Sequence, residues 1–306
     1  MKLKTPPYLK KGDRVALVAP AGFLTDEKPI LLAEQLLQSW GLVAIRSDFL
    51  LEQDGYFAGT DAQRSQDFQK ALDNPKIKAI WAVRGGYGSM RILSKLKYTK
   101  FVKNPKWIIG FSDITAFHSV LHNIGYKSIH GIMPIQLTKP VKETEKATES
   151  LYKALFKKDV ESIIPASKYN RIGSTEAVVV GGNLSILQSL LGSPCQIKTK
   201  NKILFIEEIG EDMYRVDRLL QSLKAAGYFR DLKALIVGSF RDIKTDSIAG
   251  VKTYQELILE VVEEYEYPVL FDVPSGHIAD NRALILGAEV LINVGEFVSC
   301  IRFKQG

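Results

Sequence analysis

The sequence predicts an α/β fold in which the first half forms a doubly wound parallel sheet. Short apolar runs alternate there with segments of helical periodicity, and several runs end at a turn that contains glycine or proline. The last stretch, 283–303, differs because Gly287 and Gly295 separate β-rich runs, which predicts closing antiparallel strands. The two halves therefore predict different kinds of sheet.

In the first half, strands and helices are expected in turn along the chain. Strands are expected at 14–19, 43–45, 77–83 and 107–110, and helices at 27–40, 60–72 and 114–123. In doubly wound sheets, ligands bind beyond the carboxyl ends of the strands. The turns at 20–22, 84–88 and 110–113 each follow a strand, so we expect them to converge on one edge and to mark a site.

The segment 141–172 separates two domains in our interpretation. It is polar, and a Lys/Glu-rich helix is followed there by irregular sequence. We expect an N-terminal domain at 1–140, a connector at 141–172 and a C-terminal domain at 173–306. In the C-terminal domain, strands are expected at 175–180, 202–207, 232–239 and 268–271, and helices at 183–191, 214–226 and 253–264.

Length and composition are those of a globular protein. The chain has 306 residues, enough for two domains, with 46% hydrophobic and 25% charged residues. No apolar run approaches the ~20 residues that cross a bilayer, and the N-terminus lacks the apolar core of a signal peptide. We expect a cytoplasmic protein with no membrane partner.

The net charge of +7, from 41 basic and 34 acidic residues, raises the question of nucleic-acid binding. Lysines are interleaved with acids, as at 142–146, and the sequence has no basic helix or aromatic-basic strip. We therefore expect no nucleic-acid partner, whereas an anionic small substrate is compatible with the charge. Cys195 and Cys300 are far apart in sequence, form no metal-ligand cluster, and are not expected to form a disulfide in a reducing compartment.

Ser112 stands where an apolar run stops at Gly-Phe-Ser-Asp and a helix begins. A serine on a sharp strand-to-helix turn has an exposed hydroxyl, and the helix N-terminus stabilises developing negative charge, which suits a nucleophile. Serine and aspartate are also ordinary N-cap residues, so this segment alone favours a cap over a catalyst.

The histidines suggest a base but no metal site. His118 and His122 share a helix face, but the metalloprotease glutamate and a third ligand are missing, so we interpret them as surface or packed side chains. His130 follows a short strand and either lines the site or is a hydrogen-bonded loop histidine. His277 lies in a loop punctuated by proline and glycine, where a scaffold can hold a general base; a structural histidine is the alternative.

Two further segments carry candidate chemistry. Glu207 and Glu208 end a strand, and because neighbouring strand residues point to opposite faces, at most one of them orients a histidine; a surface acidic pair is the alternative. The turn 84–88, Arg-Gly-Gly-Tyr-Gly, is neither a P-loop nor a dinucleotide fingerprint. Its glycines either bring backbone N–H groups close to a substrate oxyanion or simply form a tight turn.

Taken together, these segments resemble the LD-carboxypeptidase family, serine peptidases that include the muramoyl-tetrapeptide carboxypeptidases. The matching segments run in order along almost the whole chain, and although each is weak alone, the ordered set is specific. They are the motifs at 12–14, 18–22, 57–61 with Arg64, 84–88, 110–113, 181–184, 205–208, 214–218 and 276–277.

The resemblance implies a Ser-His-Glu triad. It assigns Ser112 as nucleophile, His277 as general base and Glu207 as the carboxylate that orients the imidazole. Glu207 is preferred to Glu208 because the family's glutamate is the first acid after the strand. The order serine, glutamate, histidine spans both domains and therefore predicts a site in the cleft between them.

The same resemblance implies an oxyanion hole made by the Asp113 backbone N–H and one N–H of the Gly85-Gly86 turn. It also implies a flavodoxin-like N-terminal domain, a smaller β-rich α/β C-terminal domain and a homodimer, with neither a metal nor another cofactor. A carboxypeptidase must bind a terminal carboxylate, for which Arg84 is our candidate because a guanidinium grips a carboxylate with two hydrogen bonds. Bracing of the glycine turn is the alternative role for Arg84.

The resemblance also implies murein tetrapeptide as the substrate. The enzyme would hydrolyse an L,D-peptide bond and release the terminal D-alanine in cell-wall recycling. One alternative is the microcin C self-immunity branch of the family, which cleaves peptidyl or aminoacyl sulfamoyl adenylates. That branch predicts an aromatic platform for a nucleobase, and 141–172 offers only Tyr152, Phe156 and Tyr169. The other alternative is a non-catalytic murein-peptide-binding protein, against which the intact triad residues argue.

Overall fold

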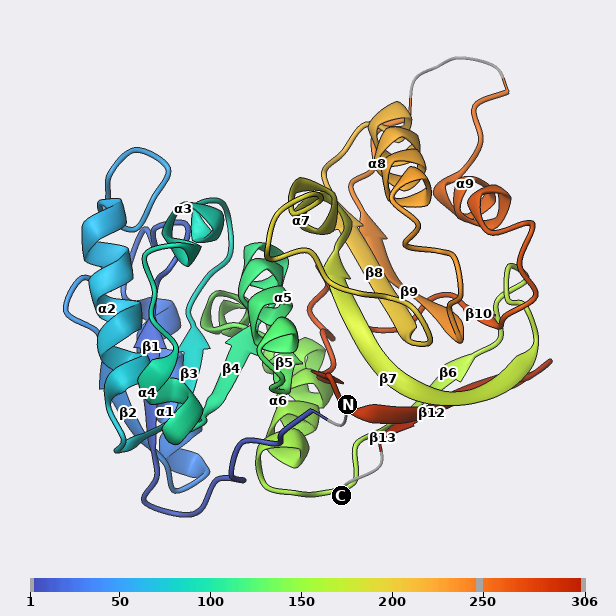
Figure 1. Ribbon diagram of the computed structural model, residues 1–306. Helices are drawn as coiled ribbons and strands as arrows, with labels where there is room; N and C mark the ends of the chain where they lie inside the picture. The colour runs from blue at the N-terminus through green and yellow to red at the C-terminus, as the bar shows by residue number, and fades with distance from the viewer. Residues whose placement is uncertain (1–2, 246–249, 304–306) are drawn as a thin grey trace.

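The computed structural model describes residues 3–245 and 250–303. The described chain contains a six-stranded and a seven-stranded sheet, and helices pack against both (Figure 1). We call the six-stranded sheet with helices α1 to α6 the first lobe, and the seven-stranded sheet with helices α7 to α9 the second lobe. The mixed α/β class expected from the sequence is confirmed.

The first sheet is parallel except for one edge strand. Its order is β11-β5-β4-β3-β1-β2, so its five N-terminal strands follow the order 2-1-3-4-5 of flavodoxin-like sheets. Those strands are β1 (Arg14–Val18), β2 (Val43–Arg46), β3 (Ile77–Ala82), β4 (Trp107–Gly110) and β5 (Ser128–His130). β11 (Leu284–Leu286) pairs antiparallel with β5, although it comes from the far end of the chain.

Helices cover both faces of the first sheet. Alternate residues of a strand face opposite sides, so Val15 and Leu17 join one core cluster and Ala16 and Val18 another. One side carries α1 (Lys28–Ser39) and α6 (Val141–Leu155); the other carries α2 (Asp61–Asp73), α3 (Ser89–Leu93), α4 (Thr99–Lys103), the 3₁₀ turn η1 (Ser112–Ile114) and α5 (Thr115–Asn123). Within the described ranges, no helix has the length and apolarity needed to cross a membrane.

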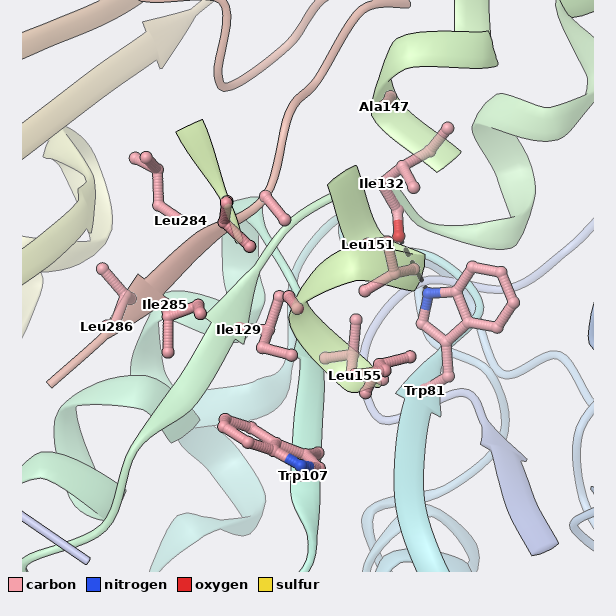
Figure 2. Close-up of a cluster of buried hydrophobic side chains, with 14 of the residues drawn as sticks. Trp81, Trp107, Ile129, Ile132, Ala147, Leu151, Leu155, Leu284, Ile285 and Leu286 are labelled. Carbon is pink, nitrogen blue, oxygen red and sulfur yellow. Dashed lines mark hydrogen bonds between the residues drawn. The ribbon is translucent and has the colours of Figure 1, made fainter. Parts of the chain in front are cut away.

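Helix α6 is part of the first core. Figure 2 shows Leu151 and Leu155 of α6 among the side chains of β3, β4, β5 and β11. Trp81 completes this cluster, and its indole N–H donates to the Ile132 carbonyl at 2.8 Å, just before the 3₁₀ turn η2 (Pro134–Thr138). The core on this side therefore joins residues from both ends of the chain.

The second sheet is half parallel and half antiparallel. Its order is β10-β9-β8-β7-β12-β13-β6. The parallel strands are β7 (Gly173–Asn183), β8 (Ile203–Ile209), β9 (Ala234–Arg241) and β10 (Val269–Leu270), with helices α7 (Leu184–Ser189), α8 (Met213–Ala225) and α9 (Tyr254–Val261). The antiparallel strands are β12 (Glu289–Val294), β13 (Val298–Phe303) and β6 (Glu161–Pro165). The antiparallel strands expected near the C-terminus are confirmed.

Two details differ from the sequence-based expectation. The prediction of an irregular segment after the helix in 141–172 is wrong at β6. This strand pairs with β13 and forms an edge of the second sheet. The terminal stretch 283–303 contributes strands to both sheets, because β11 joins the first and β12 the second. In both cases the partner strand lies far away in sequence, so local patterning carries no signal for the pairing. The domain boundaries at 140 and 172 remain a prediction.

The two lobes meet where β7 ends beside the start of α5. The backbone N–H of Asn183 donates to Thr115 Oγ1 at 3.0 Å. Asn183 pairs with Glu207 in the parallel register of β7 and β8. The carboxyl end of β8 therefore lies close to the turn that carries Ser112.

We predict that Leu151→Ala destabilises the protein strongly, because Leu151 is 1% exposed and its truncation leaves a cavity between α6 and the first sheet. The expected loss is about 2–5 kcal/mol in the free energy of unfolding, measured by urea denaturation. The matched control is Leu31→Ala on α1, where the side chain is 47% exposed and the expected change is below about 0.5 kcal/mol. Equal losses in the two variants would mean that α6 does not belong to the core.

Candidate active site

Ser112 lies at the tight turn between β4 and α5, as the sequence predicts. Its φ of +60° puts a non-glycine residue in the left-handed region, which costs free energy and is found in strained functional turns. The side chain caps neither η1 nor α5, so the interpretation as an ordinary N-cap is wrong. Among the described residues, the hydroxyl of Ser112 has no hydrogen-bond partner and is available to a ligand.

The glycine turn packs directly against Ser112. A Cβ placed on Gly85 would lie 2.9 Å from the Ser112 Cβ and 3.5 Å from the Asp113 nitrogen, so only a glycine permits this approach. The Gly85 carbonyl accepts from the Gly22 N–H at 2.9 Å. Because a trans peptide directs its N–H away from its carbonyl, the Gly86 N–H points away from Gly22. Within the described residues, neither the Gly86 N–H nor the Asp113 N–H has a backbone acceptor.

Buried polar side chains brace these turns. Asp113 is 1% exposed, and its Oδ2 accepts from the Ser89 N–H at 2.7 Å, which ties the serine turn to the helix after the glycine turn. Burial raises the pKa of Asp113. The guanidinium of Arg64 donates to the carbonyls of Pro20 and Gly88 at 2.7 and 2.9 Å. The sequence marks Arg64 only as part of a motif, because its bracing role depends on carbonyl partners that sequence does not reveal.

His277 and Glu207 form a buried pair. The Nδ1 atom of His277 lies 2.6 Å from Oε2 of Glu207, and Glu207 is fully buried. Burial favours the neutral imidazole, but the charge of Glu207 and its hydrogen bond outweigh that effect and raise the pKa of His277. Gly276, at φ +120°, allows the close approach, because a Cβ there would lie 2.7 Å from Glu207 Oε2.

Glu208 points the other way, as alternation along β8 predicts. Its carboxylate accepts from Asn183 Nδ2 at 2.9 Å, and from the Ser185 N–H and hydroxyl at 2.8 and 2.7 Å. It therefore holds the start of α7 and makes no contact with His277. Burial raises the pKa of Glu208. Of the two acids, Glu207 is the one that meets the histidine.

Ser112 and His277 line one cavity of about 920 Å³, to which both lobes contribute. The ring of Phe111, next to the serine, lies 4.8 Å from the ring of His277. The lining residues are Arg84, Gly85, Gly86, Phe111, Ser112, Met133, Ile135, Gln136, Lys139, Glu143, Ile209, Arg241, His277, Ile278 and Ala279. The cavity thus combines an apolar wall with three cationic side chains and one carboxylate.

Arg84 lines this cavity, and it also braces the neighbouring loop. Its Nη1 donates to the carbonyl of Phe23, and its guanidinium lies over the Phe23 ring at 5.8 Å from the centroid. The brace uses one nitrogen, so the remaining N–H groups of Arg84 are available to a ligand.

The other histidines lie outside this cavity. His118 is buried, and its ring nitrogens lie 2.8 Å from Ser128 Oγ and 2.9 Å from the Gly110 carbonyl, as expected of a packed side chain. His122 lines a different cavity. His130 is the last residue of β5 and is fully buried, and neither ring nitrogen has a hydrogen-bond partner in the described parts of the chain. Neither of the two roles expected for His130, pocket lining or a hydrogen-bonded loop position, is correct.

Metal-ligating groups are scattered in the part of the chain that the structure describes. No group of three or more histidine, cysteine, aspartate or glutamate residues is placed there to hold a metal ion. Cys195 and Cys300 are both free. The chemistry that this site supports is acyl transfer by a serine that shares a cavity with a histidine–carboxylate pair.

Comparison with known proteins supports this interpretation. The LD-carboxypeptidase N-terminal domain matches residues 15–131, and the LD-carboxypeptidase C-terminal domain matches 176–292. A probable murein peptide carboxypeptidase of Bacillus subtilis is 34% identical, covering 97% of this chain and 93% of that protein. The murein tetrapeptide carboxypeptidase of Pseudomonas aeruginosa is 30% identical, covering 91% of this chain and 92% of that protein.

Solved structures share the fold over nearly the whole chain. The crystal structure of muramoyltetrapeptide carboxypeptidase from Oxalobacter formigenes matches with a TM-score of 0.84 at 26% identity, covering 95% of this chain and 98% of that chain. MccF in complex with glutamyl sulfamoyl guanosine matches with a TM-score of 0.86 at 24% identity, covering 100% of this chain and 99% of that chain. At that identity, the likeness to MccF shows the fold alone.

The two family models follow one another along the chain; the first covers β1 to β5 of the first sheet, and the second covers β7 to β10 and β12 of the second sheet together with β11. Together they span more than half of the chain, and the Bacillus subtilis relative supports the same assignment over its length. On these grounds the chain belongs to the LD-carboxypeptidase family of peptidases.

Proposed function

We propose that this chain is a serine carboxypeptidase that releases the terminal D-alanine of murein tetrapeptide by hydrolysing an L,D-peptide bond. The observation that carries the proposal is that Ser112 and His277 line the same cavity. Glu207 contacts His277 there at 2.6 Å. The relatives named for murein peptides support the substrate.

In the proposed mechanism, Ser112 is the nucleophile and His277 the general base. Glu207 occupies Nδ1 of His277 and leaves Nε2 to accept the serine proton. As the proton moves, the serine oxygen attacks the carbonyl carbon, and Glu207 stabilises the imidazolium that forms. His277 then donates the proton to the amine of the departing D-alanine. A water molecule, deprotonated by His277, hydrolyses the acyl-enzyme and regenerates Ser112.

The oxyanion of the tetrahedral intermediate is held by the N–H groups of Asp113 and of the Gly85-Gly86 turn, where Gly86 provides the donor. The support is the packing of Gly85 against Ser112 and the absence of other backbone acceptors for these two N–H groups among the described residues. Fixed backbone donors need no reorganisation when negative charge develops, which is why they lower the barrier.

Arg84 binds the terminal carboxylate in this proposal. It lines the cavity next to the glycine turn, and its guanidinium retains free N–H groups after bracing Phe23. A fixed cation beside the oxyanion donors positions a C-terminal residue so that its preceding peptide carbonyl reaches Ser112.

The nucleotide-peptide alternative finds less support in this cavity. The ring of Tyr152 packs against Phe156 at 4.5 Å between ring centroids, and Tyr169 packs on Phe271 at 5.9 Å. None of Tyr152, Phe156 and Tyr169 is among the lining residues of the cavity, so these rings offer no platform for a nucleobase there. Mass spectrometry after incubation with murein tetrapeptide and with a nucleotide peptide separates the alternatives: loss of one alanine, cleavage of the nucleotide peptide only, or no change for a binding protein.

A cytoplasmic location and a homodimeric state complete the proposal. Both follow the family resemblance, and the two free cysteines suit a reducing compartment. Light scattering coupled to size-exclusion chromatography tests the dimer; the mass of one chain, 34.2 kDa, at micromolar concentration would contradict it.

We predict that Ser112→Ala lowers kcat for D-alanine release by at least about 10³-fold, because it removes the nucleophile. Binding of the tetrapeptide, measured by calorimetry, stays within a few fold. The matched control is Ser119→Ala on α5, whose hydroxyl donates to the Thr115 carbonyl and whose loss leaves kcat nearly unchanged. A Ser112→Ala enzyme with more than a small fraction of wild-type activity would show that the nucleophile lies elsewhere.

We predict that Glu207→Gln and Glu208→Gln differ sharply. Activity requires neutral His277, so kcat/KM rises with pH through the pKa of His277, which Glu207 raises. Glu207→Gln removes the negative charge that raises the pKa of His277, so the acidic limb of the pH profile moves to lower pH. The same change lowers kcat by about 10²–10⁴-fold. Glu208→Gln lowers thermal stability through α7 and moves the acidic limb much less, because the charge of Glu208 is a smaller cause of the raised pKa of His277 than Glu207. Equal mild losses of activity would remove glutamate from the triad.

We predict that Arg84→Ala raises KM for the tetrapeptide by roughly 10- to 100-fold, as expected for losing hydrogen bonds to a charged group. Arg241→Ala and Lys139→Ala are the controls, because both side chains line the same cavity, and they change KM by less than about 3-fold. A larger KM increase in either control than in Arg84→Ala would transfer the carboxylate-binding role to that residue.

A further inference from the structure

We propose that Gln136 is a positioning residue that sets the loop of His277 against the lobe that carries Ser112. The inference rests on the proposed function, because it concerns how His277 reaches the serine. Gln136 belongs to η2 in the first lobe, whereas the loop 271–283 leaves the second sheet at β10 and enters the first sheet at β11. The loop therefore crosses between the lobes, and contacts along its length decide where His277 lies.

The amide of Gln136 bonds to the first lobe and to the loop that carries His277 at once. Its Nε2 donates to the carbonyl of Ile278, the residue after His277, at 2.7 Å. Its Oε1 accepts from the Met133 N–H at 3.1 Å within the first lobe, and from Asn281 Nδ2 at 3.4 Å across the junction. The orientation of the amide is set by these partners, because a carbonyl faces the nitrogen and two N–H donors face the oxygen.

Asn281 extends the contact to the residue before His277. Asn281 is fully buried, and its Oδ1 accepts from the Gly276 N–H at 2.8 Å. Gln136 thus directly holds the carbonyl of Ile278, the residue after His277. Through Asn281 it also holds the N–H of Gly276, the residue before His277. The imidazole is fixed from both sides of its own backbone, and Glu207 fixes its ring.

A small displacement of this loop has a large effect on the reaction. Ser112 lies in the first lobe and His277 on the loop between the lobes, so no single rigid element fixes the distance between them. A misplacement of about 1 Å in a reacting pair costs about 10²-fold in rate. An amide is required at 136, because a carboxylate cannot donate to Ile278 and an aliphatic side chain can neither donate nor accept.

Direct substrate binding by Gln136 is the competing explanation, because Gln136 also lines the cavity. Its oxygen already accepts two hydrogen bonds and one N–H of its nitrogen is donated to Ile278, so only the second N–H is left for a substrate. The two explanations differ in what they affect: substrate contact changes KM, whereas positioning changes kcat and also the reactivity of Ser112 toward a reagent that needs no peptide binding.

The test compares Gln136→Leu with wild type in two rates. One is kcat for D-alanine release from murein tetrapeptide; the other is phosphonylation of Ser112 by a small fluorophosphonate, followed by intact mass. We expect both rates to fall by a similar factor, roughly 10- to 100-fold, with KM within about 3-fold of wild type. A raised KM with an unchanged phosphonylation rate, or no change in either rate, would overturn the proposal.

Gln136→Glu keeps the test decisive if the leucine variant does not fold. The glutamate retains an acceptor for Met133 and Asn281 but, when ionised, cannot donate to the Ile278 carbonyl, so a smaller loss in both rates is expected. Wild-type values for both rates in this variant would equally contradict the proposal.

Gln69→Leu is the matched control. Gln69 also clamps backbone through its amide, with Nε2 donating to the Lys97 carbonyl at 2.9 Å and Oε1 accepting from the Lys97 N–H at 2.8 Å, but both groups lie within the first lobe. Its loss should affect melting temperature and neither rate. If Ser112→Ala remains active, the proposed function fails; if Ser112→Ala is inactive while Gln136→Leu behaves as Gln69→Leu, only this inference fails.

Discussion

The buried contact between His277 and Glu207 is the interaction on which the site depends. A carboxylate with no exposed surface is costly unless it is paired, and the imidazole 2.6 Å away provides the pairing. The pair can form only if β8, which carries the acid, and the loop from β10 to β11, which carries the base, pack closely. Gly276 makes that approach possible, and the same loop then delivers the imidazole to the cavity of Ser112.

The first lobe contributes a rigid platform to this arrangement. Its parallel strands end at one edge, where the serine turn and the glycine turn pack against each other. Arg64 and Asp113 hold these turns through backbone groups, so the strained φ of Ser112 is maintained by neighbours on two sides. The proposed site therefore combines a fixed serine with an imidazole on the loop that joins the two lobes.

Much of this organisation is predictable from sequence, and the exceptions have a physical origin. Periodicity and turn residues predict the alternating strands and helices of the first sheet and the strand that ends at Glu207. They miss β6 and place β11 only as part of a terminal antiparallel group, because the partners of these strands lie far away in the chain. Alternation along a strand also predicts that Glu207 and Glu208 diverge, whereas the choice between them needed the family resemblance. Gln136 and Asn281 carry no sequence signal, since an amide acquires a role only through the carbonyl and N–H groups folded around it.

The most direct test of this account is a proton NMR titration of the His277 ring in the wild-type protein, with His277→Gln used to assign the signal. We expect a pKa above the ordinary histidine value of ~6.5, because Glu207 outweighs the effect of burial. A pKa below the ordinary value would contradict it, since that is the behaviour of a buried imidazole without a carboxylate partner.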